Sequence, residues 1–160
     1  MYQLGATFHA QGLLLKGNRV FQKSVVAYKN ALAVLDADNH ALELVSVHNN
    51  RGAVLHHLAE SEQNVERLEE AIRSYETALT VCMEQQLPFH LAAMCRVNRS
   101  TARGVLAELS QNAALVQEVA DEFELIISLF HNALQPLCLK HCEQQLQKAE
   151  LLVIALSDQQ

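Results

Sequence analysis

Proline and glycine are scarce in this sequence of 160 residues, which has two prolines, five glycines and no proline before Pro88. Both residues interrupt helices, proline because it lacks an amide hydrogen and glycine because its backbone is conformationally free. Runs of β-branched residues are short, whereas alanine, leucine, glutamate and glutamine are abundant. This composition favours helix along nearly the whole chain. The expected fold class is therefore all-α, in one domain of residues 1–160.

The sequence also lacks a cluster of lysine and arginine, and its formal net charge is -6. Nucleic acid and anionic membranes attract basic patches, so we expect neither as a partner. No apolar stretch approaches the roughly 18 residues that a membrane-spanning helix needs, and the first residues show no signal-peptide pattern. Four cysteines without a secretory signal indicate reduced thiols. We therefore expect a cytoplasmic protein.

Apolar periodicity and turn residues divide the chain into seven expected helices. They cover residues 3–16, 20–36, 40–60, 64–85, 89–109, 113–134 and 136–157. Pro88 separates two of them, because the residue before a proline is pushed out of the helical region. Pro136 stands where a first-turn proline would open the last helix. The polar residues 61–64 are read either as a loop or as the cap of the following helix.

One short pattern recurs three times, and it consists of an aromatic residue, alanine three positions later and leucine next to the alanine. The copies lie at residues 28–32, 75–79 and 130–134, and their rings are Tyr28, Tyr75 and Phe130. On a helix this spacing places ring, alanine and leucine on one stripe. Three copies of one packing stripe predict three copies of one structural unit, in which all three rings are buried.

This pattern resembles the tetratricopeptide repeat, a unit of two antiparallel helices. In that family the first helix carries a large apolar residue, then a small residue four positions later and another large residue three after that. Those positions hold Phe8, Gly12 and Leu15, then His48, Gly52 and Leu55, then Arg96, Ser100 and Arg103. The second helix carries a small residue, an aromatic and alanine. Those positions hold Ser24, Tyr28 and Ala31, then Ala71, Tyr75 and Ala78, then Ile126, Phe130 and Ala133.

The resemblance implies an α-solenoid of about three helix-turn-helix units and a terminal helix. The units are expected at residues 3–37, 40–86 and 89–135, and the terminal helix at 136–157. The unit lengths differ, since Gly12 to Ser24 is 12 residues whereas Gly52 to Ala71 is 19. Long units of this kind resemble a bacterial subgroup of the repeat.

Proteins of this family bind peptides on a concave face lined by their first helices, so the resemblance implies a protein-interaction module. Asn50 and Asn98 each precede arginine and a small residue, as in the family motif, and are expected to bond a peptide backbone in the groove. The equally weighted alternative is that both asparagines bond neighbouring helix backbones. The expected groove residues are His9, Asn49, Asn50, His56 and Asn98.

One version of this groove holds a carboxylate between lysines and two asparagines. The matching lysine positions here hold His9, Leu13 and Met94. The family's carboxylate clamp is therefore not expected.

Residues 151–156 form a run of six apolar residues in the last expected helix. At about 100° per residue, such a run covers the whole circumference of a helix. A terminal helix normally shows water a polar face, and an exposed apolar patch marks an interface. The alternative function is therefore a structural, self-associating protein, and we expect a homodimer unless a following helix covers this face. The expected interface residues are Leu151, Leu152, Val153 and Leu156.

A metal or small-ligand sensor is a remote alternative. Cys138, His141 and Cys142 share a helix face at i, i+3 and i+4, and His131 is a conceivable fourth ligand. Structural zinc sites usually show two tight ligand pairs, and buried cysteines behave as small apolar residues. We therefore expect no metal and no cofactor, and expect Cys82 to lie in the core like the other cysteines.

Nothing in the sequence indicates an enzyme, because covalent catalysis needs a nucleophile, a base and an orienting group in one pocket. No glycine-rich loop or nucleophile elbow is present. The acidic pairs Glu69-Glu70 and Asp121-Glu122 are interpreted as solvated faces near helix starts, where negative charge suits the helix dipole.

Overall fold

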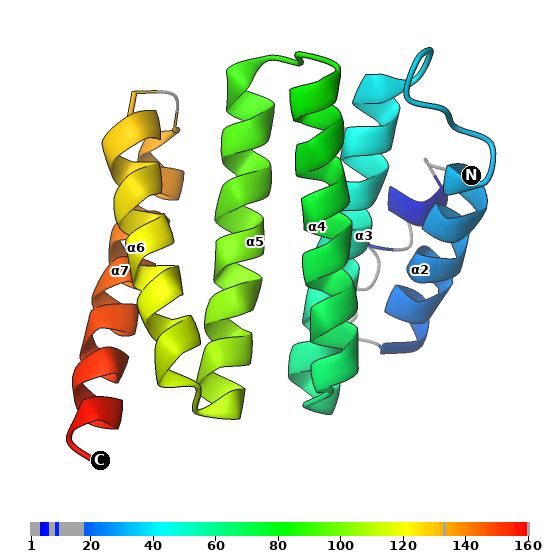
Figure 1. The fold of residues 1–160 in the computed structure, drawn as a ribbon. Coiled ribbons are helices and arrows are strands. Elements are labelled where there is room, and N and C mark those ends of the chain that lie inside the picture. The colour runs from blue at the N-terminus through cyan, green and yellow to red at the C-terminus, as the bar shows by residue number, and fades with distance from the viewer. Residues whose placement is uncertain (1–3, 7–8, 10–17, 133, 160) are drawn as a thin grey trace. The chain divides into compact units, whose positions relative to one another are not determined.

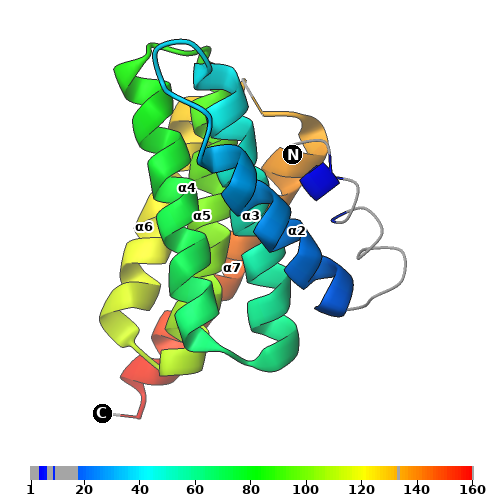
Figure 2. The same ribbon diagram turned by 90° about the vertical axis from the view of Figure 1, so that its right-hand side faces the viewer.

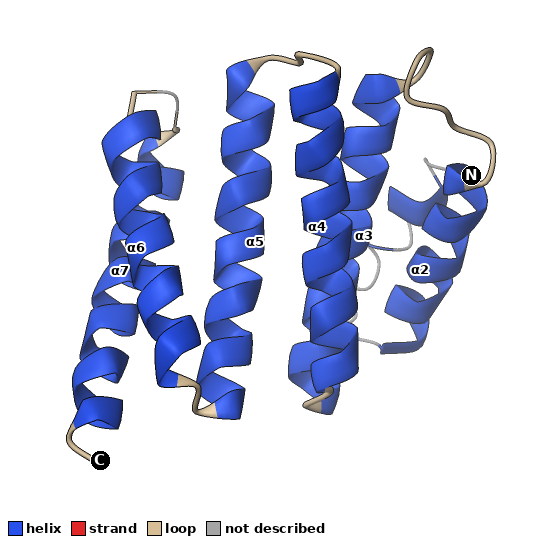
Figure 3. Cartoon of the chain, viewed as in Figure 1, coloured by secondary structure: helices blue, strands red, loops and turns tan. Residues whose placement is uncertain are grey.

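The computed structural model describes residues 4–6, 9, 18–132 and 134–159. These residues form helices joined by turns, without a strand among them, so the all-α prediction is confirmed (Figure 3). Figure 1 labels α2 (Asn18–Leu32), α3 (Ala41–Glu62), α4 (Val65–Glu84), α5 (Phe89–Ser110), α6 (Ala113–Phe130) and α7 (Pro136–Ser157). Residues 4–6 and 9 are also helical. The chain divides into two compact units, residues 1–88 and residues 89–160. None of the described helices is long and apolar enough to cross a lipid bilayer.

Two helices end earlier than the sequence predicts. α2 ends at Leu32 instead of residue 36, and in the turn beyond it the Asp36 side chain accepts hydrogen bonds from the backbone and side-chain nitrogens of Asn39 at 2.9 and 3.0 Å. Such local side-chain bonds offer the backbone an alternative to continuing the helix. α6 ends at Phe130 instead of residue 134.

The turns before α4 and α6 are built in the same way. Gln63 and Gln111 end the preceding helices with positive φ angles of 49° and 50°. The backbone N–H groups of Asn64 and Asn112 then bond carbonyls five residues earlier, at 3.0 and 3.2 Å. Both asparagine side chains also accept a hydrogen bond from the amide three residues later, at 3.1 Å. Residues 61–64 thus include a helix cap, and the two caps lie 48 residues apart.

The unit of residues 1–88 is held together by tyrosine rings that lie on glycine backbone. Tyr28 and Tyr75 are 0% and 2% exposed. A Cβ atom built on Gly52 would lie 2.6 Å from the Tyr75 ring, and one built on Gly5 would lie 2.8 Å from the Tyr28 ring. Only glycine allows so close an approach. Figure 2 shows α2 crossing in front of α3, against which it packs.

The structure places Gly5 against the Tyr28 ring in the first unit. Gly5 also accepts a hydrogen bond on its carbonyl from Ser24 at 2.6 Å. Gly12, the glycine that the sequence pattern placed in this unit, lies outside the described residues. The two candidates are seven residues apart, about two helical turns, and so share a helix face. Counted from Gly5, Tyr28 follows its glycine by 23 residues, as Tyr75 follows Gly52. The two units then have the same length, and the difference expected from Gly12 disappears.

The unit of residues 89–160 places another ring at this position. Phe123 is 0% exposed, and it follows the buried Ser100 by 23 residues, as Tyr75 follows Gly52. Phe130 is also buried, so the expected burial of all three rings is confirmed. The Phe130 ring, at the end of α6, stacks on the ring of Phe89, the first residue of α5, with centroids 4.5 Å apart. By its spacing from Ser100, Phe123, two helical turns before Phe130, is the counterpart of Tyr28 and Tyr75.

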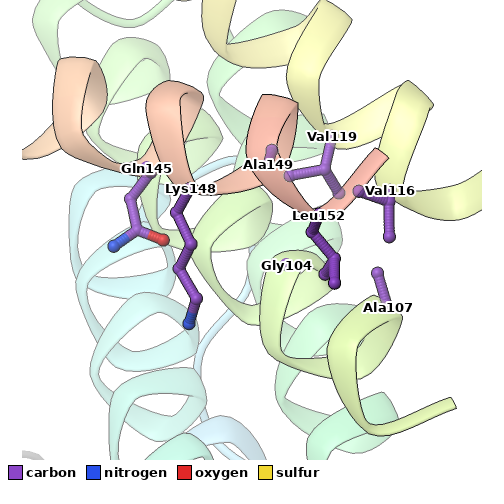
Figure 4. Close-up of a pocket in the computed structure, with 8 residues that line it drawn as sticks. All are labelled: Gly104, Ala107, Val116, Val119, Gln145, Lys148, Ala149 and Leu152. Atoms are coloured by element: carbon purple, nitrogen blue, oxygen red, sulfur yellow. The ribbon is translucent and has the colours of Figure 1, made fainter. Parts of the chain in front are cut away.

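A small cavity lies among α5, α6 and α7 (Figure 4). Its lining includes Gly104 and Ala107 from α5 and Ala149 and Leu152 from α7. The volume of about 20 Å³ accommodates roughly one water molecule. The cavity is thus a packing gap and too small for a ligand.

The surroundings of Gly52 on α3 and Gly104 on α5 predict that substitution by alanine changes the free energy of unfolding in opposite directions. Gly52→Ala forces the buried Tyr75 ring to move, so we expect a net loss of about 1–2 kcal/mol in the free energy of unfolding. A Cβ on Gly104 would meet only Val119, at 3.6 Å, so Gly104→Ala should gain about 0.5–1 kcal/mol from helix propensity. Urea denaturation of both variants measures the difference. Equal stability of the two variants would contradict the described packing of Tyr75.

Candidate functional site

The expected groove residues of α3 differ in accessibility. Asn49 is 7% exposed and the His56 side chain 13%, so both point into the protein. α3 packs against both α2 and α4, and its buried residues therefore spread over more than one face. Asn50 is half-buried and His57 exposed, and these two lie seven residues apart on one face. Asn50 and His57 are thus accessible on α3, whereas Asn49 and His56 are not.

The remaining groove residues are divided between the two units. His9 lies in the unit of residues 1–88 and is half-buried. Asn98 lies on α5, in the unit of residues 89–160, and is also half-buried. That Asn50 and Asn98 share one groove remains a prediction.

His9 belongs to a cluster of aromatic rings with Phe21, His56 and His57. Its ring centroid lies 5.9 Å from those of both Phe21 and His57. Phe21 and His57 stack at 5.7 Å, and His56 follows at 6.4 Å from His57. Burial lowers the pKa of His9, and the nearby His57 lowers it further. The pKa of His56 is also lowered by burial, although the Glu60 carboxylate, 3.6 Å away, partly opposes this.

A second polar cluster lies between α3 and α4, and sequence reasoning missed it. Arg51 donates hydrogen bonds to the Ser74 hydroxyl and to the Glu70 carboxylate. His48, one turn before Arg51, has a buried Nδ1 atom without a hydrogen-bond partner in the described part of the chain. Burial, followed by the charge of Arg51, lowers the pKa of His48. The sequence contains one signal of this cluster, a repeated pair of residue types. Arg51 and Glu70 recur 48 residues later as Arg99 and Glu118.

The corresponding helices of the second unit carry a ladder of ion pairs. Glu122 accepts from Arg99 at 2.9 Å and from Arg96 at 3.4 Å, and Arg103 pairs with Glu118. The Glu122 side chain is only 15% exposed. Its interpretation as part of a solvated face was therefore wrong, because two guanidinium groups enclose it. These pairs also explain how arginines stand where the family pattern expects apolar residues.

The candidate metal ligands of α7 have other neighbours. The Thr101 hydroxyl donates to the Val97 carbonyl at 2.8 Å, so it accepts from His141 Nε2, which lies 2.9 Å away. Cys142 is buried, and desolvation together with the neighbouring Cys138 raises the pKa of its thiol to about 12. In the described part of the chain, no group of three or more His, Cys, Asp or Glu side chains is arranged to hold a metal ion. Cys82 is 2% exposed, in agreement with its expected core position.

The four expected interface residues of α7 do not lie on one exposed face. Leu152, Val153 and Leu156 pack into the core of residues 89–160, and Leu156 is 7% exposed. Leu151 is 61% exposed, as is its neighbour Ile154 at 58%. An interface on α7 would therefore use Leu151 and Ile154, while the other three residues stabilise their own unit.

Comparison with family models, with curated proteins and with solved structures gives no match for this chain.

The buried histidines predict that stability falls in mild acid. His9, His48, His56 and His141 all have pKa values lowered from 6.5 in the folded protein. As the pH falls through 6.5 the unfolded chain therefore binds more protons than the folded one, and the free energy of unfolding decreases. We expect the thermal midpoint to drop between pH 7.5 and pH 5.5.

The variant His56→Gln should reduce this drop, because it removes one buried imidazole. The exposed His90 supplies the matched control, since His90→Gln should leave the drop unchanged. A thermal midpoint that is constant over this pH range, or that rises in acid, would contradict the assigned burial.

Proposed function

We propose that this protein is a tetratricopeptide-like α-solenoid that binds a protein partner, as a peptide or a helix, in a groove of its first helices. It acts in the cytoplasm and without catalysis. The observation that carries this proposal is the ring packed on glycine backbone, with Gly5 and Tyr28 in one helix pair and Gly52 and Tyr75 in the next. Helical repeats built on one such contact stack in order and leave a continuous face of first helices, the surface that repeat proteins use for binding.

The binding mechanism relies on amide side chains that face the partner. Asn50 on α3 is half-buried and makes no hydrogen bond to another described residue, so its amide group is available to a bound backbone. In this proposal the half-buried Asn98 on α5 supplies the second amide group to the bound partner. His57 supplies a further polar group on the accessible face of α3.

Self-association through α7 is the second candidate function. The exposure of Leu151 and Ile154, which lie three residues apart on one helix face, favours it. A two-fold dimer is the commonest closed form that such a patch can produce. Because three of the six apolar residues serve the core, this surface is narrower than the sequence predicts.

Groove binding predicts that the two asparagines act together. Peptides selected from a random library against the wild-type chain should bind Asn50→Ala and Asn98→Ala about two- to tenfold more weakly, the effect of one lost hydrogen bond. Fluorescence anisotropy measures the dissociation constants. The control is Asn30→Ala, an exposed asparagine of α2, which should bind like the wild type. Peptides that bind both Asn50→Ala and Asn98→Ala as tightly as the wild type would contradict the proposal.

Dimerisation through α7 predicts a dimer mass in light scattering at micromolar concentration. Leu151→Glu should return the protein to the mass of one chain, because it places a charge in an apolar contact. Val34→Glu changes an exposed apolar residue of the other unit and should leave the mass unchanged. A wild-type chain that scatters as a monomer would contradict this second function.

A further inference from the structure

The helix pairs α3–α4 and α5–α6 carry equivalent polar positions 48 residues apart, with different residues in several of them. Arg51 and Glu70 of the first pair correspond to Arg99 and Glu118 of the second, so these positions keep their residue types, although Arg99 pairs with Glu122 and Glu118 with Arg103. The other equivalent positions hold different residues in the two pairs. The first pair has His48, Arg73, Ser74 and Thr77 where the second has Arg96, Asp121, Glu122 and Leu125.

In the second pair, an internal carboxylate fills the centre of this arrangement. Glu122 lies between Arg96 and Arg99, at 3.4 and 2.9 Å from their nitrogens. Its side chain is largely shielded from solvent. The geometry of this helix pair therefore accommodates one carboxylate group beside Arg96 and Arg99 of α5.

In the first pair, that carboxylate is replaced by a hydroxyl. Ser74 stands at the position of Glu122, and its oxygen accepts a hydrogen bond from Arg51. His48 stands at the position of Arg96, and its buried Nδ1 atom has no partner among the described residues. A groove of about 290 Å³ lies here, lined by His48, Arg51, Glu70, Arg73, Ser74 and Thr77.

The charge of the groove favours an anion. Glu70 neutralises Arg51, with which it forms an ion pair. Arg73 is exposed and has no ion pair within the described residues, whereas its counterpart in the second helix pair is acidic. The groove therefore carries one more positive than negative charge before His48 is counted, and one carboxylate balances it.

We propose that this groove binds a carboxylate group of a partner, at the position that Glu122 occupies in the second helix pair. The Ser74 hydroxyl accepts from Arg51, so its own hydrogen can be donated to the carboxylate. His48 Nδ1 and the Arg73 guanidinium supply the other donors, and charge-assisted hydrogen bonds of this kind are among the strongest in proteins. Thr77 contributes shape alone, because its hydroxyl already donates to the Arg73 carbonyl at 2.9 Å.

A carboxylate fits this groove better than a phosphate does. The internal group at the equivalent position has two oxygens and one charge. A phosphate monoester carries close to two charges at neutral pH and would exceed the single positive charge that the groove has in surplus. The carboxylate can come from an acidic side chain or from a chain terminus, since both present the same two oxygens.

This site is independent of the proposed peptide groove. It uses none of His9, Asn49, Asn50, His56 and Asn98. Loss of carboxylate binding and loss of peptide binding are therefore separate outcomes, and Asn50→Ala should retain the carboxylate site.

Nuclear magnetic resonance titration of the full chain tests the proposal. The probes are sodium acetate, acetyl-Ala-Glu-Ala-amide, acetyl-Ala-Gln-Ala with a free terminal carboxylate, and the neutral acetyl-Ala-Gln-Ala-amide. Sodium chloride at equal ionic strength is the reference. We expect saturable shifts of the His48 ring and Ser74 amide signals with acetate and with at least one charged peptide. The peptide that saturates at lower concentration identifies the source of the carboxylate. Shifts that do not saturate, or that the neutral peptide reproduces, would overturn the proposal.

Two variants locate the binding in this groove. Ser74→Glu supplies the internal carboxylate of the second helix pair and should abolish the saturable shifts. Arg73→Gln should weaken acetate binding about two- to fivefold, as for loss of one exposed charge contact. Lys29→Gln removes an exposed cation of α2 and should leave binding unchanged.

Circular dichroism shows whether Ser74→Glu folds. If it does not fold, Arg73→Gln tests the site instead, because Arg73 is exposed and its substitution should not disturb the fold. Equal acetate binding by Arg73→Gln and Lys29→Gln would place the anion elsewhere and refute the site.

Discussion

The contact between an aromatic ring and a glycine backbone is the constraint on which the first unit depends. Tyr75 covers Gly52 so closely that a single added methyl group would overlap the ring. Tyr28 covers Gly5 in the same way, and both rings are almost fully excluded from solvent. The ring fixes how near the two helices can approach, and the glycine fixes where along the helix they meet. The other packed residues of each pair follow from this one alignment.

The second unit carries different residues at the equivalent spacing. Ser100 replaces glycine, Phe123 replaces tyrosine, and both remain buried. A ladder of arginine and glutamate pairs lies beside them. Partly buried ion pairs of this kind stabilise a structure only when every charge has its partner. Glu122 is the shared partner of two guanidinium groups, whereas Ser74 at the same place in the first helix pair supplies no charge.

The burial of the three expected rings could be predicted from the sequence, since aromatic, alanine and leucine at helical spacing mark a core stripe. Their register could not, because positions seven residues apart lie on the same helix face. Gly12 and Phe130 satisfy the same periodicity as Gly5 and Phe123. The close approach of Gly5 to the Tyr28 ring and the complete burial of Phe123 come only from the structure. The candidate groove was less predictable, because α3 is covered by two neighbouring helices and Asn49 is consequently buried.

The sequence by itself determined that the chain is helical, where most helices begin and end, and which residue types fill the core. These properties depend on local propensity, on capping residues such as Asn64, and on apolar periodicity, all of which act over a few helical turns. The tertiary structure decided which of two equivalent turns makes each contact and which polar side chains stay accessible. It also decided that Glu122 is enclosed by arginines while the buried Ser74 lines a groove. Those outcomes depend on side chains that are distant in the sequence, so no local pattern contains them.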